Sequence, residues 1–155
     1  MIKNREREII MKVNIKRLNE NAIIPTYGSE YAGGADLYAC IEETVTIQPH
    51  ETKLIKTGIA IELPVGYVAL IYARSGLATK RGLAPANKVG VVDCDYRGEI
   101  MVALHNHSPK AQSIDCGERI AQMVITPYIT AEFEETDTLS DTVRGKGGFG
   151  STGTK

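Results

Sequence analysis

From Val13 onward, the apolar residues of this chain occur in short runs that are interrupted by Gly, Pro, Asn and Asp. Almost no stretch keeps the 3.6-residue period of an amphipathic helix. This pattern predicts an all-β fold, in which many short strands and turns form a sandwich or a barrel. One helical turn is expected at residues 76–80, with Ser75 as its N-cap. Strands are expected at residues 13–17, 35–38, 44–47, 54–63, 67–73, 89–92, 99–106 and 119–127.

The length of 155 residues corresponds to one domain. Trp is absent and Phe occurs only twice, so the core is expected to be aliphatic. Residues 1–10 are highly charged and precede a cleaner strand-like pattern, so we interpret them as a candidate N-terminal extension. The β domain is expected at residues 11–141, followed by a mobile C-terminal segment at residues 142–155.

The charge and cysteine content exclude several classes of protein. With 18 basic and 19 acidic residues, the net charge is -1, which argues against a nucleic-acid-binding or membrane-binding surface. Cys40, Cys94 and Cys116 are odd in number and lack CxxC spacing, so neither a disulfide framework nor a zinc site is predicted. No apolar run has the length of a signal peptide or a membrane span, and a cytoplasmic protein is expected.

The C-terminal segment breaks the strand pattern. Half of residues 144–153 are Gly, and this segment cannot bury enough surface to order itself. Glycine backbone can approach a phosphate closely, while Arg144, Ser151 and Thr152 can bind its oxygens. Phe149 is interpreted as a lid that stacks on a flat ring, and a disordered tail without a role is the alternative.

Charged groups also occur within and beside the predicted strands. Arg74 and Ser75 follow a strand and suit phosphate oxygens, although a capped turn with a solvated arginine fits equally well. Asp36 lies in a small, apolar strand, so it is either a hydrogen-bonded structural acid or a carboxylate beside magnesium. Glu118 and Arg119 begin an amphipathic strand and are expected to form a surface ion pair of little energy.

Residues 90–100 join the end of an apolar strand to two acids, an aromatic ring, a cation and a turn glycine. Strand alternation would place Asp93 and Asp95 on one face and Cys94 on the other. A polar turn between two strands is the simpler interpretation of such a segment taken alone.

Taken together, these segments resemble the five ordered motifs of the trimeric dUTP diphosphatase (dUTPase) family. The resemblance extends from Met11 to the end of the sequence, and the third and fifth motifs are long enough to be highly specific. Gly33 and Ala73 stand where the family more often has Ala and Pro, and no residue of the catalytic set is missing. The five segments are residues 34–39, 73–78, 90–100, 117–122 and 144–153.

The resemblance implies a jelly-roll-like β barrel that assembles as a homotrimer with shared active sites. One subunit would provide the first, second and fourth motifs, a second would provide the third, and a third would lend its C-terminal tail. The implied substrate is dUTP with Mg2+. The products would be dUMP and pyrophosphate, formed by attack of water on the α-phosphorus.

The same resemblance assigns roles to individual residues. Asp93 would be the general base that activates the water, and Asp36 would hold Mg2+ through coordinated water. Tyr96 would pack under the deoxyribose and exclude ribose, while a hairpin at residues 87–93 would recognise uracil. The residues assigned to substrate binding are Arg74, Ser75, Gly76, Asn87, Gly90, Tyr96, Gln122, Arg144, Phe149, Gly150, Ser151 and Thr152.

Two other functions remain open at this point. One is a dCTP deaminase-like enzyme of the same fold, against which the complete C-terminal motif argues. The other is a regulatory binding protein, for which the compact spacing between the motifs offers no insertion. A purely structural jelly roll would leave Asp93 and Tyr96 without a purpose.

Overall fold

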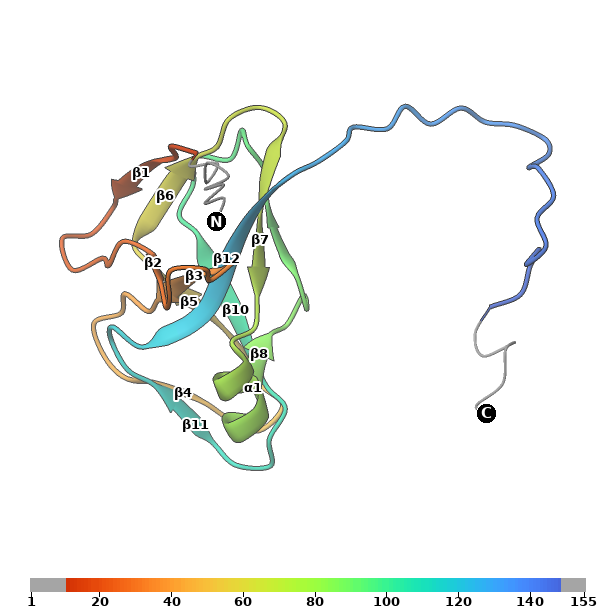
Figure 1. Ribbon diagram of the computed structural model, residues 1–155. Coiled ribbons are helices and arrows are strands. Elements are labelled where there is room, and N and C mark those ends of the chain that lie inside the picture. Colours follow the sequence, from red (N-terminus) through yellow and green to blue (C-terminus); the bar gives the residue numbers. More distant parts are fainter. Residues whose placement is uncertain (1–10, 149–155) are drawn as a thin grey trace, which may run out of the picture.

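The computed structural model describes residues 11–148, which form an antiparallel β structure with one short helix (Figure 1). The all-β prediction is therefore confirmed. The helix α1 spans Ser75–Arg81. The strands are β1 (Asn14–Arg17), β2 (Thr26–Tyr27), β3 (Ala35–Tyr38), β4 (Val45–Ile47), β5 (Thr52–Lys56), β6 (Ile59–Glu62), β7 (Tyr67–Tyr72), β8 (Leu83–Pro85), β9 (Gly90–Val92), β10 (Met101–Asn106), β11 (Gln112–Ile114) and β12 (Arg119–Pro127).

The strands form one large sheet and three smaller ones. The large sheet has the order β2-β3-β12-β7-β9, so β12 lies between β3 and β7 and β9 lies at an edge. The smaller sheets are β5-β10-β8, β1-β6 and β4-β11. Figure 1 shows β12 crossing the barrel diagonally, with α1 at one end. This central strand brings distant parts of the sequence together.

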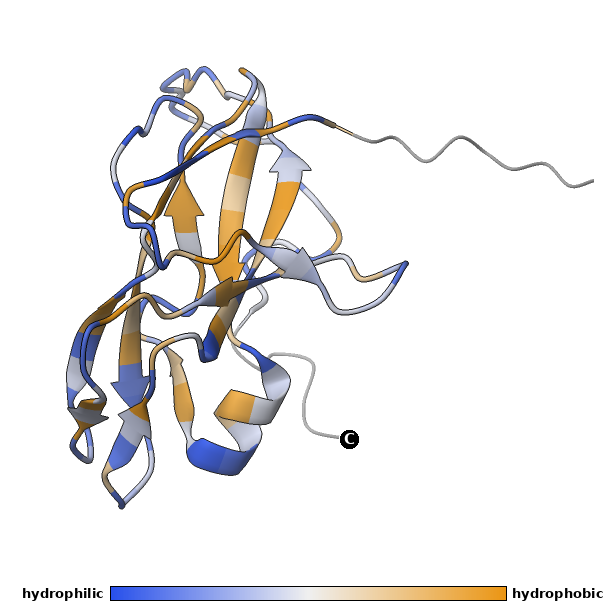
Figure 2. Cartoon of the chain, turned by 90° about the vertical axis from the view of Figure 1, so that its left-hand side faces the viewer, coloured by the Kyte–Doolittle hydropathy of each residue, from blue (hydrophilic) through white to orange (hydrophobic). Residues whose placement is uncertain are grey.

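The core is aliphatic, as the composition predicts. No aromatic ring belongs to the buried hydrophobic cluster of residues 11–148, and Figure 2 shows that hydrophobic residues (orange) are frequent in the strands. Burial of each large aliphatic side chain stabilises the fold by roughly 1.5–3 kcal/mol. The most deeply buried ones are Leu37, Ile47, Ile55, Ile59, Leu83, Ile100, Leu104, Ile114 and Ile120.

The single long strand expected at residues 54–63 is wrong, because β5 and β6 are separate strands in different sheets. The chain turns at Gly58, whose φ of +68° favours glycine. A Cβ atom at this position would lie 2.8 Å from both the Ala22 Cβ and the Cys40 Sγ atoms. The break therefore depends on a close approach between segments that are distant in the sequence.

The cap of helix α1 also differs from the prediction. Arg74, not Ser75, is the N-cap residue, and its side chain makes no capping hydrogen bond. Arg74 keeps an extended backbone (φ -82°, ψ 128°) because it continues the path of β7. The helix ends at Gly82, which has a φ of +68°.

After β12 the chain leaves the barrel (Figure 1). Its residues are exposed as far as Lys146. The candidate extension at residues 1–10 and the part of the tail at residues 149–155 lie outside the described residues. Within residues 11–148, no helix has the length and apolar character that a membrane span requires.

Candidate active site

Asp36 is held by two arginines in the large sheet, on the strand next to the central strand β12. It lies on β3 and is only 8% exposed. Its Oδ1 atom is 2.8 Å from Arg74 Nε, and its Oδ2 atom is 3.2 Å from Arg119 Nη1. Asp36 is thus an ion-paired, hydrogen-bonded carboxylate, whose fixed position also orients both guanidinium groups.

Strand β12 brings three predicted segments side by side. Gln122 lies opposite Asp36 on β3 and opposite Tyr72 on β7. Its Nε2 atom donates a 2.9 Å hydrogen bond to the Ala73 carbonyl, just before Arg74. A Cβ atom at Gly34 would lie 3.1 Å from Gln122 Oε1, so this glycine permits the close approach. The metal-binding candidate Asp36 and the substrate-binding candidates Arg74 and Gln122 therefore form one cluster.

Ser75 and Gly76 extend this cluster at the first turn of α1. Both residues are exposed. A Cβ atom at Gly76 would meet no atom within 4 Å, so the space beside the turn is open. The Ser75 hydroxyl and the Arg74 guanidinium are therefore accessible to a ligand at this edge of the cluster.

The expected surface pair between Glu118 and Arg119 is wrong. Glu118 forms an ion pair with Arg81 of α1, whereas Arg119 binds Asp36. The reason is an irregularity in the pairing of β12 with β3 between Arg119 and Ala121, which shifts the register. Arg119 is thus a site residue that reasoning from the sequence missed.

The cluster carries more positive than negative charge, because two guanidinium groups surround one carboxylate. Such an arrangement suits a ligand with several negative charges, such as a polyphosphate. No group of three or more His, Cys, Asp or Glu side chains that could hold a metal occurs in residues 11–148. Because Mg2+ keeps several waters and uses few carboxylates, Asp36 fits an ion that is also bound by phosphate oxygens.

Asp93 and Tyr96 form a second cluster beyond the end of β9. The Tyr96 N–H donates to the Asp93 carbonyl at 3.2 Å, which closes a turn over Cys94 and Asp95. The strand alternation expected for Asp93 to Asp95 is therefore wrong, because the strand ends at Val92. A cavity of about 240 Å³ lies here, lined by Leu54, Val91, Val92, Asp93, Tyr96, Glu99, Ile100 and Met101.

The orientation of Tyr96 depends on Gly98. The Tyr96 side chain is 44% exposed, and its hydroxyl donates a 3.0 Å hydrogen bond to the Glu99 carbonyl. A Cβ atom at Gly98 would lie 2.4 Å from the Tyr96 hydroxyl oxygen and 2.5 Å from the adjacent ring carbon. Any larger residue at this position would force the ring to move. Gly98 is a second site residue that the sequence did not indicate individually.

Asn87 precedes the edge strand β9, and Gly90 begins it. Gly90 pairs with Ile71, and a Cβ atom on Gly90 would lie 3.3 Å from the Asn87 amide nitrogen. The expected hairpin at residues 87–93 is not formed by two paired strands, because β8 pairs with β10 and β9 pairs with β7. The connection between them bridges two sheets and includes Lys88 with a φ of +64°.

The two clusters lie far apart within one chain. Val92 pairs with Ala69, so Asp93 lies near the level of Val68 on β7. Arg74 is six residues further along an extended backbone, a distance of about 20 Å. Side chains cannot bridge this gap, so the Asp93 of one chain does not reach a group bound by the Arg74 of the same chain.

Of the predicted tail residues, Arg144 lies within the described part of the chain. It is exposed, and its Nε atom donates a 2.8 Å hydrogen bond to the Gly147 carbonyl. The predictions for Phe149, Gly150, Ser151 and Thr152 fall outside the described residues.

The sequence model of the dUTPase family matches residues 20–153. The deoxyuridine 5'-triphosphate nucleotidohydrolase of Hydrogenobaculum sp. (strain Y04AAS1) is 52% identical over 145 residues, covering 94% of this chain and 100% of the relative. The protein of the same name from Nautilia profundicola is 53% identical over 143 residues, covering 92% and 99% of the two chains.

The solved structures that resemble this chain are also dUTPases. A variant dUTPase of Staphylococcus bacteriophage 80alpha, solved with dUpNHpp, has a TM-score of 0.84 and 29% identity, covering 92% of this chain and 99% of its own. A variant dUTPase from phage phi11 of S. aureus, which coordinates a structural Mg(II) ion, has a TM-score of 0.76 and 25% identity over 84% of this chain and 100% of its own.

Proposed function

Because this chain belongs to the dUTPase family and is an enzyme that hydrolyses dUTP, we propose that it forms dUMP and pyrophosphate through attack of a water molecule on the α-phosphorus. The structural observation that carries this proposal is the pairing of Asp36 with Arg74 and Arg119 beside Gln122. This cluster has the charge and the hydrogen-bond donors that a triphosphate requires.

Asp93 is the general base in this proposal. Its carboxylate orients the attacking water and accepts a proton from it as the bond to phosphorus forms. The exposed position of Asp93 in the lining of the 240 Å³ cavity supports this role, because both water and substrate can approach it. In phosphoryl transfer, the positioning of the nucleophile contributes much of the rate enhancement.

The triphosphate binds at the other cluster. Arg74, Ser75 and Gln122 provide donors to the phosphate oxygens, and Asp36 keeps Arg74 in place. Arg119 shares this positioning role through its ion pair with Asp36. Mg2+, when bound with the triphosphate, would neutralise part of its negative charge, with Asp36 contributing through a coordinated water.

The nucleoside binds along the free edge of β9. Edge strands carry unpaired backbone N–H and C=O groups, which can recognise the polar edge of uracil. Asn87 and Gly90 lie on this edge, and Tyr96 lies at its far end, where it supports the sugar. A rigidly held Tyr96 ring is needed there to exclude ribose. An apolar pocket alone lowers the kcat/KM of a substrate with one added hydroxyl group by only about 10²-fold.

Complete sites require several copies of the chain, and we propose a homotrimer. The separation of about 20 Å between Asp93 and Arg74 supports this assembly, because the two groups can serve one substrate only when different copies provide them. The segment at residues 142–155 is proposed to close over the bound nucleotide and exclude water. A cytoplasmic location is proposed as well, since all three cysteines are free thiols.

The substrate assignment predicts a narrow specificity. Release of pyrophosphate should be measured with dUTP, dTTP, dCTP and UTP at equal concentrations. We expect dUTP to be hydrolysed at least about 10²-fold faster than UTP, because the site must refuse the ribose hydroxyl. Comparable hydrolysis of UTP would contradict the role of Tyr96, and conversion of dCTP to a deaminated product would favour the deaminase alternative.

Substitution Gly98→Ala tests how Tyr96 is held. The added methyl group displaces the Tyr96 ring, so the ratio of kcat/KM for dUTP to that for UTP is expected to fall by about tenfold. Gly28→Ala is the matched control, because a Cβ atom there meets no atom within 4 Å and the residue lies outside the five motifs. An unchanged ratio in Gly98→Ala would show that the discrimination does not depend on this packing.

A further inference from the structure

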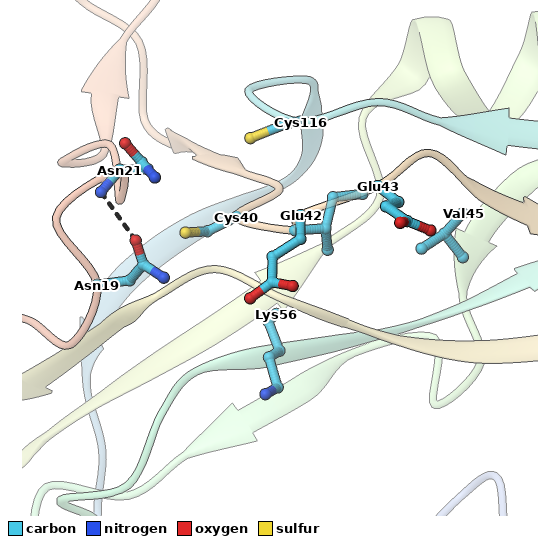
Figure 3. Close-up of a pocket in the computed structure, with 9 residues that line it drawn as sticks. Asn19, Asn21, Cys40, Glu42, Glu43, Val45, Lys56 and Cys116 are labelled. Atoms are coloured by element: carbon cyan, nitrogen blue, oxygen red, sulfur yellow. Dashed lines mark hydrogen bonds between the residues drawn. The ribbon is translucent and has the colours of Figure 1, made fainter.

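Two of the three cysteines lie together in a cavity away from both clusters. Cys40 and Cys116 line a hollow of about 770 Å³, which also includes Asn19, Glu42 and Lys56. Figure 3 shows the two thiols on neighbouring segments, between Asn21 on one side and Val45 on the other. Cys40 follows β3, and Cys116 belongs to the turn that leads into β12. The proposed hydrolysis of dUTP gives neither thiol a role.

The backbone around the two cysteines is tightly paired. The Ala39 N–H donates to the Glu118 carbonyl at 2.8 Å, and the Gly117 N–H donates to the Ala39 carbonyl at 2.8 Å. Gly117 and Glu118 thus both oppose Ala39, and Cys40 and Cys116 are the residues bonded directly to this point of contact on the two segments. Their side chains therefore lie on adjacent segments, as Figure 3 shows. Disulfides span Cα distances of about 4.4–6.8 Å, a range that adjacent segments can reach.

The two thiols differ in their surroundings. Cys40 is buried against Gly58, and burial raises the pKa of its thiol, with smaller contributions from Cys116 and Glu99. Cys116 is exposed, so an oxidant reaches it directly. An accessible thiol beside a protected one is the arrangement in which oxidation of the first can be followed by attack of the second.

We propose that Cys40 and Cys116 form a reversible disulfide within one chain when the protein meets hydrogen peroxide. The peroxide oxidises the Cys116 thiol to a sulfenic acid as its O–O bond breaks, and one water is released. The Cys40 sulfur then attacks the Cys116 sulfur, so that the S–S bond forms, the S–O bond breaks and a second water leaves. A dithiol returns the two electrons and two protons. The bond ties the end of β3 to the start of β12, the strands that carry Asp36 and Gln122.

The test counts thiols in the full-length protein. Reduced and peroxide-treated samples are unfolded, alkylated with iodoacetamide and weighed as intact chains. The reduced chain should take up three labels, and the oxidised chain should take up one, because two of the three thiols are in the bond. After tryptic digestion without reduction, residues 18–53 should be linked to residues 111–119. Treatment with dithiothreitol should restore all three labels.

Two variants distinguish formation of the Cys40–Cys116 disulfide from non-specific oxidation of the thiols. Cys116→Ser, at an exposed position, should keep both of its remaining thiols after the same treatment. Cys94→Ser should still lose both of its thiols, because Cys94 lies elsewhere, 3.8 Å from the Tyr128 hydroxyl. The proposal is overturned if the oxidised wild type keeps its Cys40 thiol, if Cys116 is linked to a second chain, or if only sulfinic acid is formed.

Discussion

Substitution Asp93→Asn is expected to lower kcat for dUTP hydrolysis by on the order of 10³-fold, while the protein remains folded and assembled. Asparagine has the same shape as aspartate but cannot accept the proton from the attacking water. Asp93 is exposed, and its carboxylate makes no hydrogen bond or ion pair within residues 11–148, so its loss should not unfold the chain. Initial rates of pyrophosphate release at saturating dUTP give kcat directly.

Asp95→Asn is the matched control for this experiment. Asp95 is exposed two residues away, in the turn over Cys94 and Asp95, where asparagine is equally acceptable. We expect its kcat to stay within about twofold of the wild type. Equal losses in both variants would indicate that the turn geometry, not a base at Asp93, limits the reaction.

Substitution Asp36→Asn should affect both activity and stability. It removes the one anion between Arg74 and Arg119, so both guanidinium groups lose their orienting partner. We expect kcat/KM for dUTP to fall by about 10²-fold because the phosphate-binding groups are misplaced. The free energy of unfolding should fall by about 2 kcal/mol, since the acid is buried while both arginines remain partly exposed to solvent.

Glu118→Gln separates the two effects of Asp36→Asn. Glu118 also pairs with an arginine, Arg81, but that pair joins the residue before β12 to α1 and does not include Asp36. We expect this variant to lose stability in urea denaturation without a comparable loss of activity. If Asp36→Asn proved as active as Glu118→Gln, then Asp36 would not position the phosphate-binding groups.

The strands that carry the site were predictable because they are long or sharply bounded. β3 and β12 have the bounds expected from their apolar residues and flanking turns. β2, β8 and β11 contain two or three residues each, which is too few for a period to emerge. The break at Gly58 was missed because the atoms that require it, in Ala22 and Cys40, are distant in the sequence.

The site itself was predictable as a set of segments but not as a set of contacts. The motif that contains Asp36 and the motif that contains Arg74 are visible in the sequence, yet nothing local indicates that the two side chains form an ion pair. The role of Arg119 follows from a register shift in β12, and the pairing pattern of a strand is decided by its neighbours. Gly98 is needed because the Tyr96 ring lies where a Cβ atom of any other residue at position 98 would be.

The sequence alone therefore determined the fold class, the family resemblance and the chemical types of the candidate residues, because each of these depends on local patterns and short motifs. The tertiary structure alone decided that Asp36 lies between Arg74 and Arg119, and that Asp93 lies about 20 Å from Arg74 along β7. Contacts and distances of this kind depend on which strands become neighbours. That choice is made by the packing of the whole barrel and not by any single segment.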